Sequence, residues 1–326
     1  MSKIPEHLIE KINSIPTQSG IYKMLDSNGR IIYVGKSISL RNRVRSYFAD
    51  NPKWAKVEKM VSFIDDIEYI VTDTHLEAIL LECNLIKEIK PMFNSQLKND
   101  EKYVYLKVED FNIYNPLSIV NSREDDCYGP FRRKFSLIEL INSFKNIYPI
   151  AKADKGYDFE YNLMPVPMDR SIFEENKESI QEIFSDDKKM ILLINRLEGK
   201  MKEAAAQLQF ATASVYRDMI YGLNYLKTGI YGYKTMFLKD ILLKMPITNG
   251  YKLFFVSKGE ILLKSVFSTL TEDDIQDFIN IGKDLKSSIS SNLNEKSSMD
   301  YRDILYSEIK SLPGEMVIYL WVRESP

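Results

Sequence analysis

Residues 19–26 and 31–36 contain short apolar runs that predict strands, and Asn28-Gly29 between them is a strong signal for a two-residue hairpin turn. In residues 64–73 the apolar positions alternate, which predicts a third strand. Over residues 40–49 the apolar spacing becomes helical, so we expect a helix between the second and third strands.

A longer helix is predicted to follow the third strand. Thr74 and Glu77 form a capping box, in which the two side chains satisfy donors in the first turn of a helix. The apolar residues keep helical spacing to about Lys90, and Pro91 cannot continue a helix. We place the end of this first domain at residue 105.

The middle of the chain gives weaker signals and then a strong helical one. Within residues 106–187 we expect a helix over 137–146, and the proline-containing stretch 151–170 predicts a linker. A strand is also predicted at 103–108. Residues 188–228 are strongly helical, and a block of alanines near their middle divides them into two helices that can pack as a hairpin.

The last region, residues 229–326, is predicted to be a small α/β region. Its expected elements are strands at 251–256 and 261–266, a helix at 273–286 and a flexible, serine-rich loop at 287–298. Taken together, these patterns place the whole chain in the α+β class, with a small antiparallel sheet flanked by helices at its N-terminal end.

The composition is that of an ordinary soluble globular protein. Of the 326 residues, 44% are hydrophobic and 28% are charged, and the formal net charge is −2. No apolar run is long enough to cross a membrane, and residues 1–10 lack the apolar core of a signal peptide. Cys83 and Cys127 are too few for a disulfide framework, so we expect a cytoplasmic protein.

Positive charge is concentrated in one segment of this weakly acidic chain. Residues 30–59 contain eight basic side chains, Lys53 among them, and two acidic ones. Such a local basic patch can bind phosphates without making the whole protein adhesive. A solvated helix face is the alternative interpretation.

The predicted hairpin brings two tyrosines together. A turn at Asn28-Gly29 places Met24 opposite Tyr33, and alternation puts Tyr22 on the same face as Met24. Tyr22 and Tyr33 are then diagonal neighbours that can act on one substrate. Strand tyrosines also pack together without any catalytic role, and the pair alone does not decide between the two.

Two helical positions add charge to this candidate site. Arg43 shares a helix face with Tyr47 and can present a planar fork of donors to a phosphate. Glu82 has only apolar neighbours at three- and four-residue spacing: Ala78, Ile79, Leu85 and Ile86. A carboxylate in an apolar face is costly unless it is paired with a basic side chain or bound to a cation, and both alternatives stay open.

The order of several short motifs resembles the GIY-YIG nuclease family. Gly20-Ile21-Tyr22 and Tyr33-Val34-Gly35 match its two signatures, with valine replacing the middle isoleucine of the second. Further segments resemble the N-terminal half of UvrC proteins: residues 40–48, 72–78, 81–87, 91–94 and 128–131. The resemblance implies that residues 1–105 form a GIY-YIG domain and that the protein is a metal-dependent DNA endonuclease.

The resemblance also implies a role for each matching residue. Glu82 would bind one divalent ion, Mg²⁺ or Mn²⁺, and Tyr33 would activate the attacking water. The residues expected to position this water, to stabilise charge on the phosphate or to support the site are Tyr22, Lys36, Arg43, Tyr47 and Asn94. Because an unperturbed tyrosine has a pKa of about 10, a base role for Tyr33 needs help from a nearby cation. Arg41 and Arg45 would contact DNA.

A second resemblance concerns the predicted helical hairpin. Residues 197–223 resemble the UVR motif, through which UvrC and UvrB proteins pair. Small residues allow the two helices to approach closely, and Phe210, Tyr216 and Arg217 are the candidate contacts with a UvrB-like partner. The alternative is a two-helix element that packs only within its own chain.

The sequence also departs from full-length UvrC proteins. Residues 151–185 contain no cysteine, so we expect no iron–sulfur cluster there. We find no acidic triad of a second nuclease in residues 229–326 and expect this region to be non-catalytic. The architecture resembles the short, Cho-like homologues of UvrC.

That resemblance implies one incision, on the 3′ side of a lesion, in double-stranded DNA loaded with UvrB during nucleotide excision repair. Induction in the SOS response is expected by the same analogy. Two alternatives are kept. One is a GIY-YIG nuclease that acts on branched or foreign DNA outside excision repair. The other is a non-catalytic adaptor recruited to damage.

Overall fold

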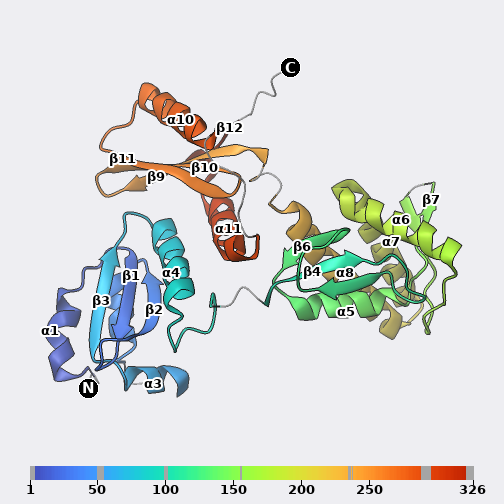
Figure 1. Ribbon diagram of the computed structural model, residues 1–326, viewed down its shortest axis with the longest axis horizontal. Coiled ribbons are helices and arrows are strands. Elements are labelled where there is room, and N and C mark those ends of the chain that lie inside the picture. The colour runs from blue at the N-terminus through green and yellow to red at the C-terminus, as the bar shows by residue number, and fades with distance from the viewer. Residues whose placement is uncertain are drawn as a thin grey trace. The chain divides into compact units, whose positions relative to one another are not determined.

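The computed structural model describes residues 4–49, 55–98, 102–154, 156–233, 236, 238–287 and 295–320. The chain divides into two compact units (Figure 1). Unit 1 combines Met1–Asp100 with Met236–Pro326, and unit 2 is Glu101–Thr235. The sequence predicted residues 1–105 and 229–326 as separate regions, whereas the structure assigns the two ends of the chain to one unit. Among the described residues, no helix is long and apolar enough to cross a membrane.

The first sheet of unit 1 contains the three predicted strands. They are β1 (Gly20–Leu25), β2 (Ile31–Ser37) and β3 (Asp66–Val71), in the antiparallel order β2-β1-β3. Its helices are α1 (Glu6–Ser14), α2 (Leu40–Ser46) and α3 (Ala55–Val61), of which only α2 was predicted. The apolar faces of α1 and α2 join the sheet in one core with Leu8, Ile12, Met24, Val44 and Ile67 fully buried. Both β2 and β3 are edge strands.

The hairpin between β1 and β2 differs from the predicted two-residue turn. Asp26 N–H donates to the Arg30 carbonyl at 3.0 Å, and Gly29, at φ 72°, donates to the Asp26 carbonyl at 2.9 Å. The loop therefore has three residues, the next most common hairpin geometry, with glycine in the left-handed position. A bulge between Met24 and Leu25 shifts the register by one residue, so Met24 still lies opposite Tyr33 as predicted.

Helix α4 (His75–Ile89) has the predicted caps. The Thr74 hydroxyl accepts a hydrogen bond from Glu77 N–H at 3.3 Å, which satisfies one of the free donors of the first turn. At the other end Lys90 adopts a left-handed conformation, at φ 51°, and donates to the Ile86 carbonyl. Pro91 follows, so the helix ends where the sequence predicted.

The C-terminal part of unit 1 is an antiparallel sheet with a helix pair. Its strands, in the order β11-β10-β9-β12, are β9 (Asp240–Ile247), β10 (Gly250–Ser257), β11 (Glu260–Phe267) and β12 (Val317–Leu320). The helices are α10 (Glu272–Ser287), α11 (Glu295–Ser311) and the short 3-10 turn η2 (Gly314–Met316). Helix α10 packs against β10 and β11, whereas α11 packs against α4 (Figure 1).

Two predictions for this region need correction. Strand β9 was not predicted, although residues 240–247 pair with β10 along their whole length. The predicted loop 287–298 lies partly outside the described residues, and its last four residues are helical because α11 begins at Glu295. Serine lowers helix propensity only weakly, so tertiary packing decides the conformation there.

Unit 2 combines small sheets with four helices. Its strands are β4 (Val104–Val108), β5 (Leu117–Val120) and β6 (Cys127–Phe131), in the order β5-β4-β6, and the pair β7 (Ala151–Ala153) and β8 (Gly156–Asp158). Its helices are α5 (Lys134–Phe144), α6 (Arg170–Ser185), α7 (Asp187–Ala206) and α8 (Phe210–Tyr231). All of these helices contribute side chains to one apolar core.

The stretch 151–170 is not the linker that the sequence predicted. It contains β7 and β8, and Tyr157, Phe159 and Met168 are buried in the core of unit 2. Tyr157, Phe159 and Tyr161 alternate with acidic residues over only five positions, so this strand-like spacing is a weak local signal for their burial. The predicted helical hairpin, in contrast, is present as α7 and α8.

One glycine allows α8 to approach α5 closely. Gly222 is buried, and a Cβ atom placed there would lie 2.8 Å from Cδ1 of Leu140 on α5. Gly199 on α7 offers a contrast within the same hairpin, because a Cβ atom there would meet nothing within 4 Å.

We therefore expect opposite effects from two identical substitutions. Gly222→Ala should lower the free energy of unfolding by about 1–3 kcal/mol through overpacking against Leu140. Gly199→Ala should raise it by about 0.5–1 kcal/mol, because alanine loses less backbone entropy in a helix. Chemical denaturation of the two variants measures both effects, and an equal effect from both would contradict this account of the α5–α8 contact.

Candidate active site

Three tyrosines from different elements meet on one face of the first sheet. Tyr22 comes from β1, Tyr33 from β2 and Tyr47 from the turn that ends α2. The ring centroids lie 5.9–6.1 Å apart in all three pairs. The Tyr47 hydroxyl is 2.6 Å from that of Tyr22 and 3.4 Å from that of Tyr33. The predicted convergence of Tyr22 and Tyr33 is therefore confirmed, and Tyr47 joins them.

A glycine makes room for this cluster. Gly35 lies opposite Tyr22 in the β1–β2 pair, and a Cβ atom at Gly35 would come within 2.3 Å of the Tyr22 hydroxyl. Any other residue at this position would push the Tyr22 ring away from its partners. The glycine of the second motif is thus required by packing on the neighbouring strand.

Arg43 brings positive charge to the three hydroxyl groups. Its guanidinium lies 5.0 Å from the centroid of the Tyr47 ring, a cation–π contact, and it also hydrogen-bonds the Tyr22 side chain. Helix α2 places Arg43 and Tyr47 one turn apart, as their four-residue spacing predicted. Several donors of the planar guanidinium are thus directed at one small space.

Glu82 lies on the face of α4 that is turned toward β2. Its Oε1 accepts a hydrogen bond from the backbone N–H of Lys36 at 3.1 Å, and Lys36 Nζ is 3.9 Å from Oε2. The side chain is only 15% exposed. Burial raises the pKa of Glu82, and the charge and backbone N–H of Lys36 only partly oppose this shift. Lys36 is the basic side chain near Glu82 that one interpretation of the sequence expected. Its charge does not fully stabilise the ionised carboxylate.

Asn94 supports the same edge strand. Its Oδ1 accepts from Val34 N–H at 2.9 Å, and its Nδ2 donates to the Val34 carbonyl at 2.8 Å. Phe93 N–H donates to the Ile32 carbonyl at 2.9 Å, one step along the strand. Asn94 and Glu82 thus bind the backbone of β2 at residues 34 and 36, between which Gly35 accommodates Tyr22.

The Tyr22 and Tyr33 hydroxyls keep their protons at neutral pH. Burial raises the pKa of Tyr22 and of Tyr33 well above the ordinary value, and the neighbouring Tyr47 raises both further. Glu82 adds to the shift at Tyr33, whereas Arg43 lowers both pKa values by a smaller amount. Without further positive charge, the groups that the site offers are neutral hydroxyls.

Arg41 and Arg45 each make a hydrogen bond within the protein, and the DNA contacts that the sequence predicted for them stay a prediction. Arg41 Nε donates to the Ile15 carbonyl at 2.5 Å, and Arg45 donates to the Asn13 side chain. Both arginines therefore hold α1 and the residue after it against α2. Helix α1 was not predicted, so this competing use was not foreseen. Lys53 of the basic segment lies outside the described residues.

The three candidate partner contacts of unit 2 lie in different environments. Phe210, at the start of α8, is 65% exposed. Arg217 is also exposed and binds Asp218 and Ser214 on its own helix. Tyr216 is 4% exposed and packs against Phe159 and Tyr161. Its burial in the core of unit 2 therefore does not support a role for Tyr216 at a partner surface.

The donors around Glu82 fit a hard divalent cation with an incomplete set of protein ligands. Among the described residues, no group of three or more His, Cys, Asp or Glu side chains could hold a metal ion. Glu82 alone supplies a partly desolvated carboxylate beside the Tyr33 hydroxyl. Mg²⁺ usually keeps several waters and uses one or two carboxylates together with substrate phosphates, so this arrangement suits it.

Comparison with known families agrees with this site. Residues 18–95 match the family model described as the UvrC-like GIY-YIG domain, so this part of unit 1 is a GIY-YIG domain. Residues 192–225, across α7 and α8, match the UvrB/UvrC motif. Both matches fall where the motifs in the sequence indicated them.

Individual relatives support the same assignment. The chain is 37% identical over 232 residues to UvrABC system protein C of Thermoanaerobacter sp. (strain X514), covering 66% of this chain and 38% of the relative. It is 35% identical over 293 residues to UvrABC system protein C of Alkaliphilus oremlandii (strain OhILAs), covering 82% of this chain and 46% of the relative. The matched part thus spans less than half the length of these relatives.

A solved structure has been described for the corresponding domain of another organism. The magnesium-bound GIY-YIG N-terminal endonuclease domain of UvrC from Thermotoga maritima is 38% identical, with a TM-score of 0.26. The match covers 28% of this chain and 100% of that domain. Other structures of that domain carry single tyrosine-to-phenylalanine or asparagine-to-alanine substitutions and are likewise described as bound to its catalytic divalent cation.

The raised tyrosine pKa values predict how the site responds to alkali. We expect Tyr22 and Tyr33 to stay protonated at pH values of about 10, at which free tyrosine is half ionised. In the unfolded chain both tyrosines would ionise at a pH of about 10. The free energy of unfolding therefore keeps the full contribution of the protonated tyrosines below this pH and loses it as the pH rises further. The ¹³Cζ shifts of both residues, with free tyrosine as internal reference, measure this. Phenolate signals from both at pH of about 9 would contradict the burial argument.

Proposed function

We propose that this protein is a metal-dependent endonuclease that hydrolyses a phosphodiester bond in double-stranded DNA at the site around Glu82. The single observation that carries the proposal is the meeting of a desolvated carboxylate with three tyrosine hydroxyls, Arg43 and Lys36. A scissile phosphate needs neutralising charge and an oriented water, and this set supplies donors for both. A Mg²⁺ or Mn²⁺ ion held by Glu82 would supply the charge that polarises the phosphate.

Each side chain has a defined task in this proposal. Tyr33 orients the attacking water through a lone pair of its hydroxyl oxygen, because its raised pKa keeps the proton in place. Arg43 and Lys36 bind non-bridging phosphate oxygens, and Arg43 can do so with two donors at once. Tyr22 and Tyr47 hold the Tyr33 hydroxyl and Arg43 in register, and Asn94 fixes the strand that carries Tyr33.

We further propose that the cleavage belongs to nucleotide excision repair in the cytoplasm. The supporting observations are the UvrB/UvrC motif in α7–α8 and the relatedness to UvrABC system protein C. In this proposal a UvrB-like protein, bound to damaged DNA, recruits the chain through the exposed end of the hairpin near Phe210. The one site described here would then make one incision, on the 3′ side of the lesion.

The test is cleavage of a site-specifically damaged duplex loaded with UvrB, in the presence of Mg²⁺. We expect a single nick 3′ of the lesion, and we expect Glu82→Gln to lower its rate at least about a thousandfold, since the isosteric amide keeps the fold but not the charge. Mapping the nick on a sequencing gel, with and without UvrB and with the Glu82→Gln variant, measures both the position of the nick and its dependence on UvrB and Glu82.

Other outcomes of this test would redirect the proposal. Cleavage of undamaged branched DNA, without any need for UvrB, would indicate a GIY-YIG nuclease outside excision repair. No cleavage by the wild-type protein, with UvrB binding intact, would indicate a non-catalytic adaptor. Cleavage by Glu82→Gln at the wild-type rate would show that Glu82 has no role in the reaction.

The partner surface yields a separate prediction. Phe210→Ala should weaken binding to UvrB at least about tenfold, because exposed aromatic side chains often dominate such interfaces. Ile172→Ala is the matched control, since Ile172 is an exposed apolar residue on α6, outside the hairpin. Calorimetric titration measures both variants, and equal affinity for wild-type and Phe210→Ala would exclude this end of the hairpin.

A further inference from the structure

Helix α4 presents opposite faces to two parts of unit 1. Glu82 is directed at β2, where it accepts the hydrogen bond from Lys36 N–H. Glu77 is directed at the C-terminal sheet, where it meets lysines of β10 and β11. Five residues separate the two acids, which corresponds to a rotation of about 140° around the helix axis. A displacement of α4 at the contact of Glu77 with the C-terminal sheet would therefore also move Glu82 relative to β2.

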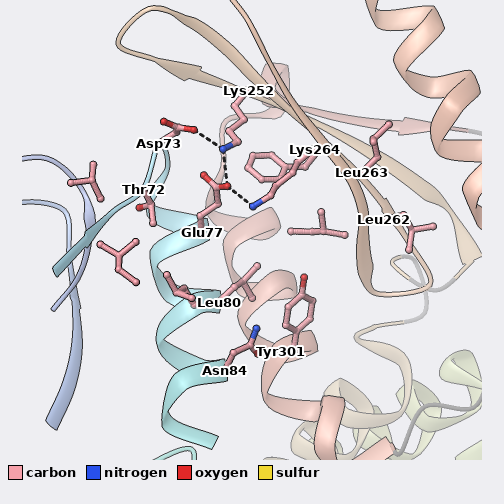
Figure 2. Close-up of a pocket in the computed structure, with 15 residues that line it drawn as sticks. Thr72, Asp73, Glu77, Leu80, Asn84, Lys252, Leu262, Leu263, Lys264 and Tyr301 are labelled. Carbon is pink, nitrogen blue, oxygen red and sulfur yellow. Dashed lines mark hydrogen bonds and ion pairs between the residues drawn. The ribbon is translucent and has the colours of Figure 1, made fainter. Parts of the chain in front are cut away.

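Lys252 of β10 holds the N-terminal end of α4. Its Nζ lies 2.6 Å from the Asp73 carboxylate and 2.7 Å from that of Glu77, as Figure 2 shows. The side chains of Lys252 and Glu77 are 9% and 11% exposed. Burial by itself would lower the pKa of Lys252, but the hydrogen bonds to Asp73 and Glu77 outweigh it and raise the pKa. A shielded pair of this kind depends strongly on geometry, because either charge left alone is costly.

A second contact holds the other end of α4, and a cavity separates the two. Lys87 Nζ is 3.1 Å from Asp300 Oδ2 on α11, and the Asp300 side chain is 2% exposed. The cavity, of about 600 Å³, lies between α4 and the C-terminal sheet (Figure 2). Residues on its walls include Leu80, Leu81, Asn84, Leu262, Leu263 and Tyr301. Because an open space replaces close packing there, the position of α4 against this sheet depends on the polar contacts at its ends.

We propose that Lys252 is a positioning residue of the nuclease, which holds the first turn of α4 so that Glu82 stays against the backbone N–H of Lys36. The proposal rests on the proposed role of Glu82 as the metal ligand. Loss of Lys252 leaves α4 itself folded, because Thr74 still caps it and acidic groups near a helix N-terminus are favourable. The first turn of α4 then lacks this contact with β10, and the position of Glu82 against β2 is less restricted. Through this contact the C-terminal region supports cleavage without touching the substrate.

The amide of Lys36 reports the position of Glu82 without metal or DNA. In the full-length Lys252→Met variant, we expect residue-resolved hydrogen exchange of the Lys36 amide to become about tenfold faster. The Val34 amide lies on the same strand edge but is held by Asn94, so its exchange should not change. Lys252→Arg should restore the protection of Lys36, because it keeps the positive charge.

Lys264→Met is the matched control. Lys264 Nζ is 3.0 Å from the same Glu77 carboxylate, but its side chain is 58% exposed, so water screens the pair. We expect wild-type exchange at Lys36 in this variant. If Lys252→Met fails to fold, Glu77→Gln removes the same contact from the other side and should accelerate exchange in the same way.

The proposal is overturned if Lys36 exchanges at the wild-type rate in folded Lys252→Met or Glu77→Gln. It is also overturned if Lys264→Met accelerates exchange as much as Lys252→Met does, since a general effect of charge would then explain both. As a second readout, Lys252→Met should raise the Mg²⁺ concentration needed for half-maximal cleavage several-fold. Because amide exchange needs neither metal nor DNA, a failure of this proposal can be told apart from a failure of the proposed function.

Discussion

The hydrogen bond from the Lys36 backbone N–H to Glu82 is the contact on which the candidate site depends. Strand β2 lies at the edge of its sheet, and an edge strand exposes donors that need partners. Glu82 from α4 and Asn94 from the segment after it supply those partners at Lys36 and Val34. The contact that closes the sheet edge therefore also delivers a carboxylate to the tyrosine cluster. The same contacts thus satisfy the edge of β2 and assemble the candidate site.

The electrostatic balance at this contact favours a cation. Burial raises the pKa of Glu82, which means that its ionised form lacks the solvation it would have in water. Lys36 and Arg43 compensate only in part, and the raised pKa values of Tyr22 and Tyr33 keep these hydroxyls neutral. A divalent ion would restore the missing stabilisation, and the excess charge of the ion would then attract a phosphate. The desolvation that disfavours the ionised carboxylate by itself would thus favour the binding of a metal ion and, through the ion, of a phosphate.

The sequence predicted those features that local spacing determines. Apolar runs around Asn28-Gly29 identified β1 and β2, and alternation identified β3. The capping box identified the start of α4, and the apolar neighbours of Glu82 marked it as an unusual acid. Contacts between distant segments were not predictable in this way. The bond of Arg41 to the Ile15 carbonyl depends on α1, and the bidentate bond of Asn94 depends on a partner sixty residues away. The alternation around Tyr157 and Phe159 extends over only five residues, and the burial of Met168 has no periodic signal.

Motif resemblance located the helical hairpin but not its free surface. A matched motif names positions, whereas the packing of α8 against its own unit decides which of them can meet a partner. Tyr216 packs against Phe159 and Tyr161 and is buried in the core of unit 2. Phe210 precedes the packed part of the helix and stays exposed. The same reasoning applies to α4, where Glu77 and Glu82 belong to one matched stretch but serve opposite faces. Assigning roles to conserved-looking acids on such a helix therefore requires knowing what covers each face, and in unit 1 the C-terminal sheet covers one of them.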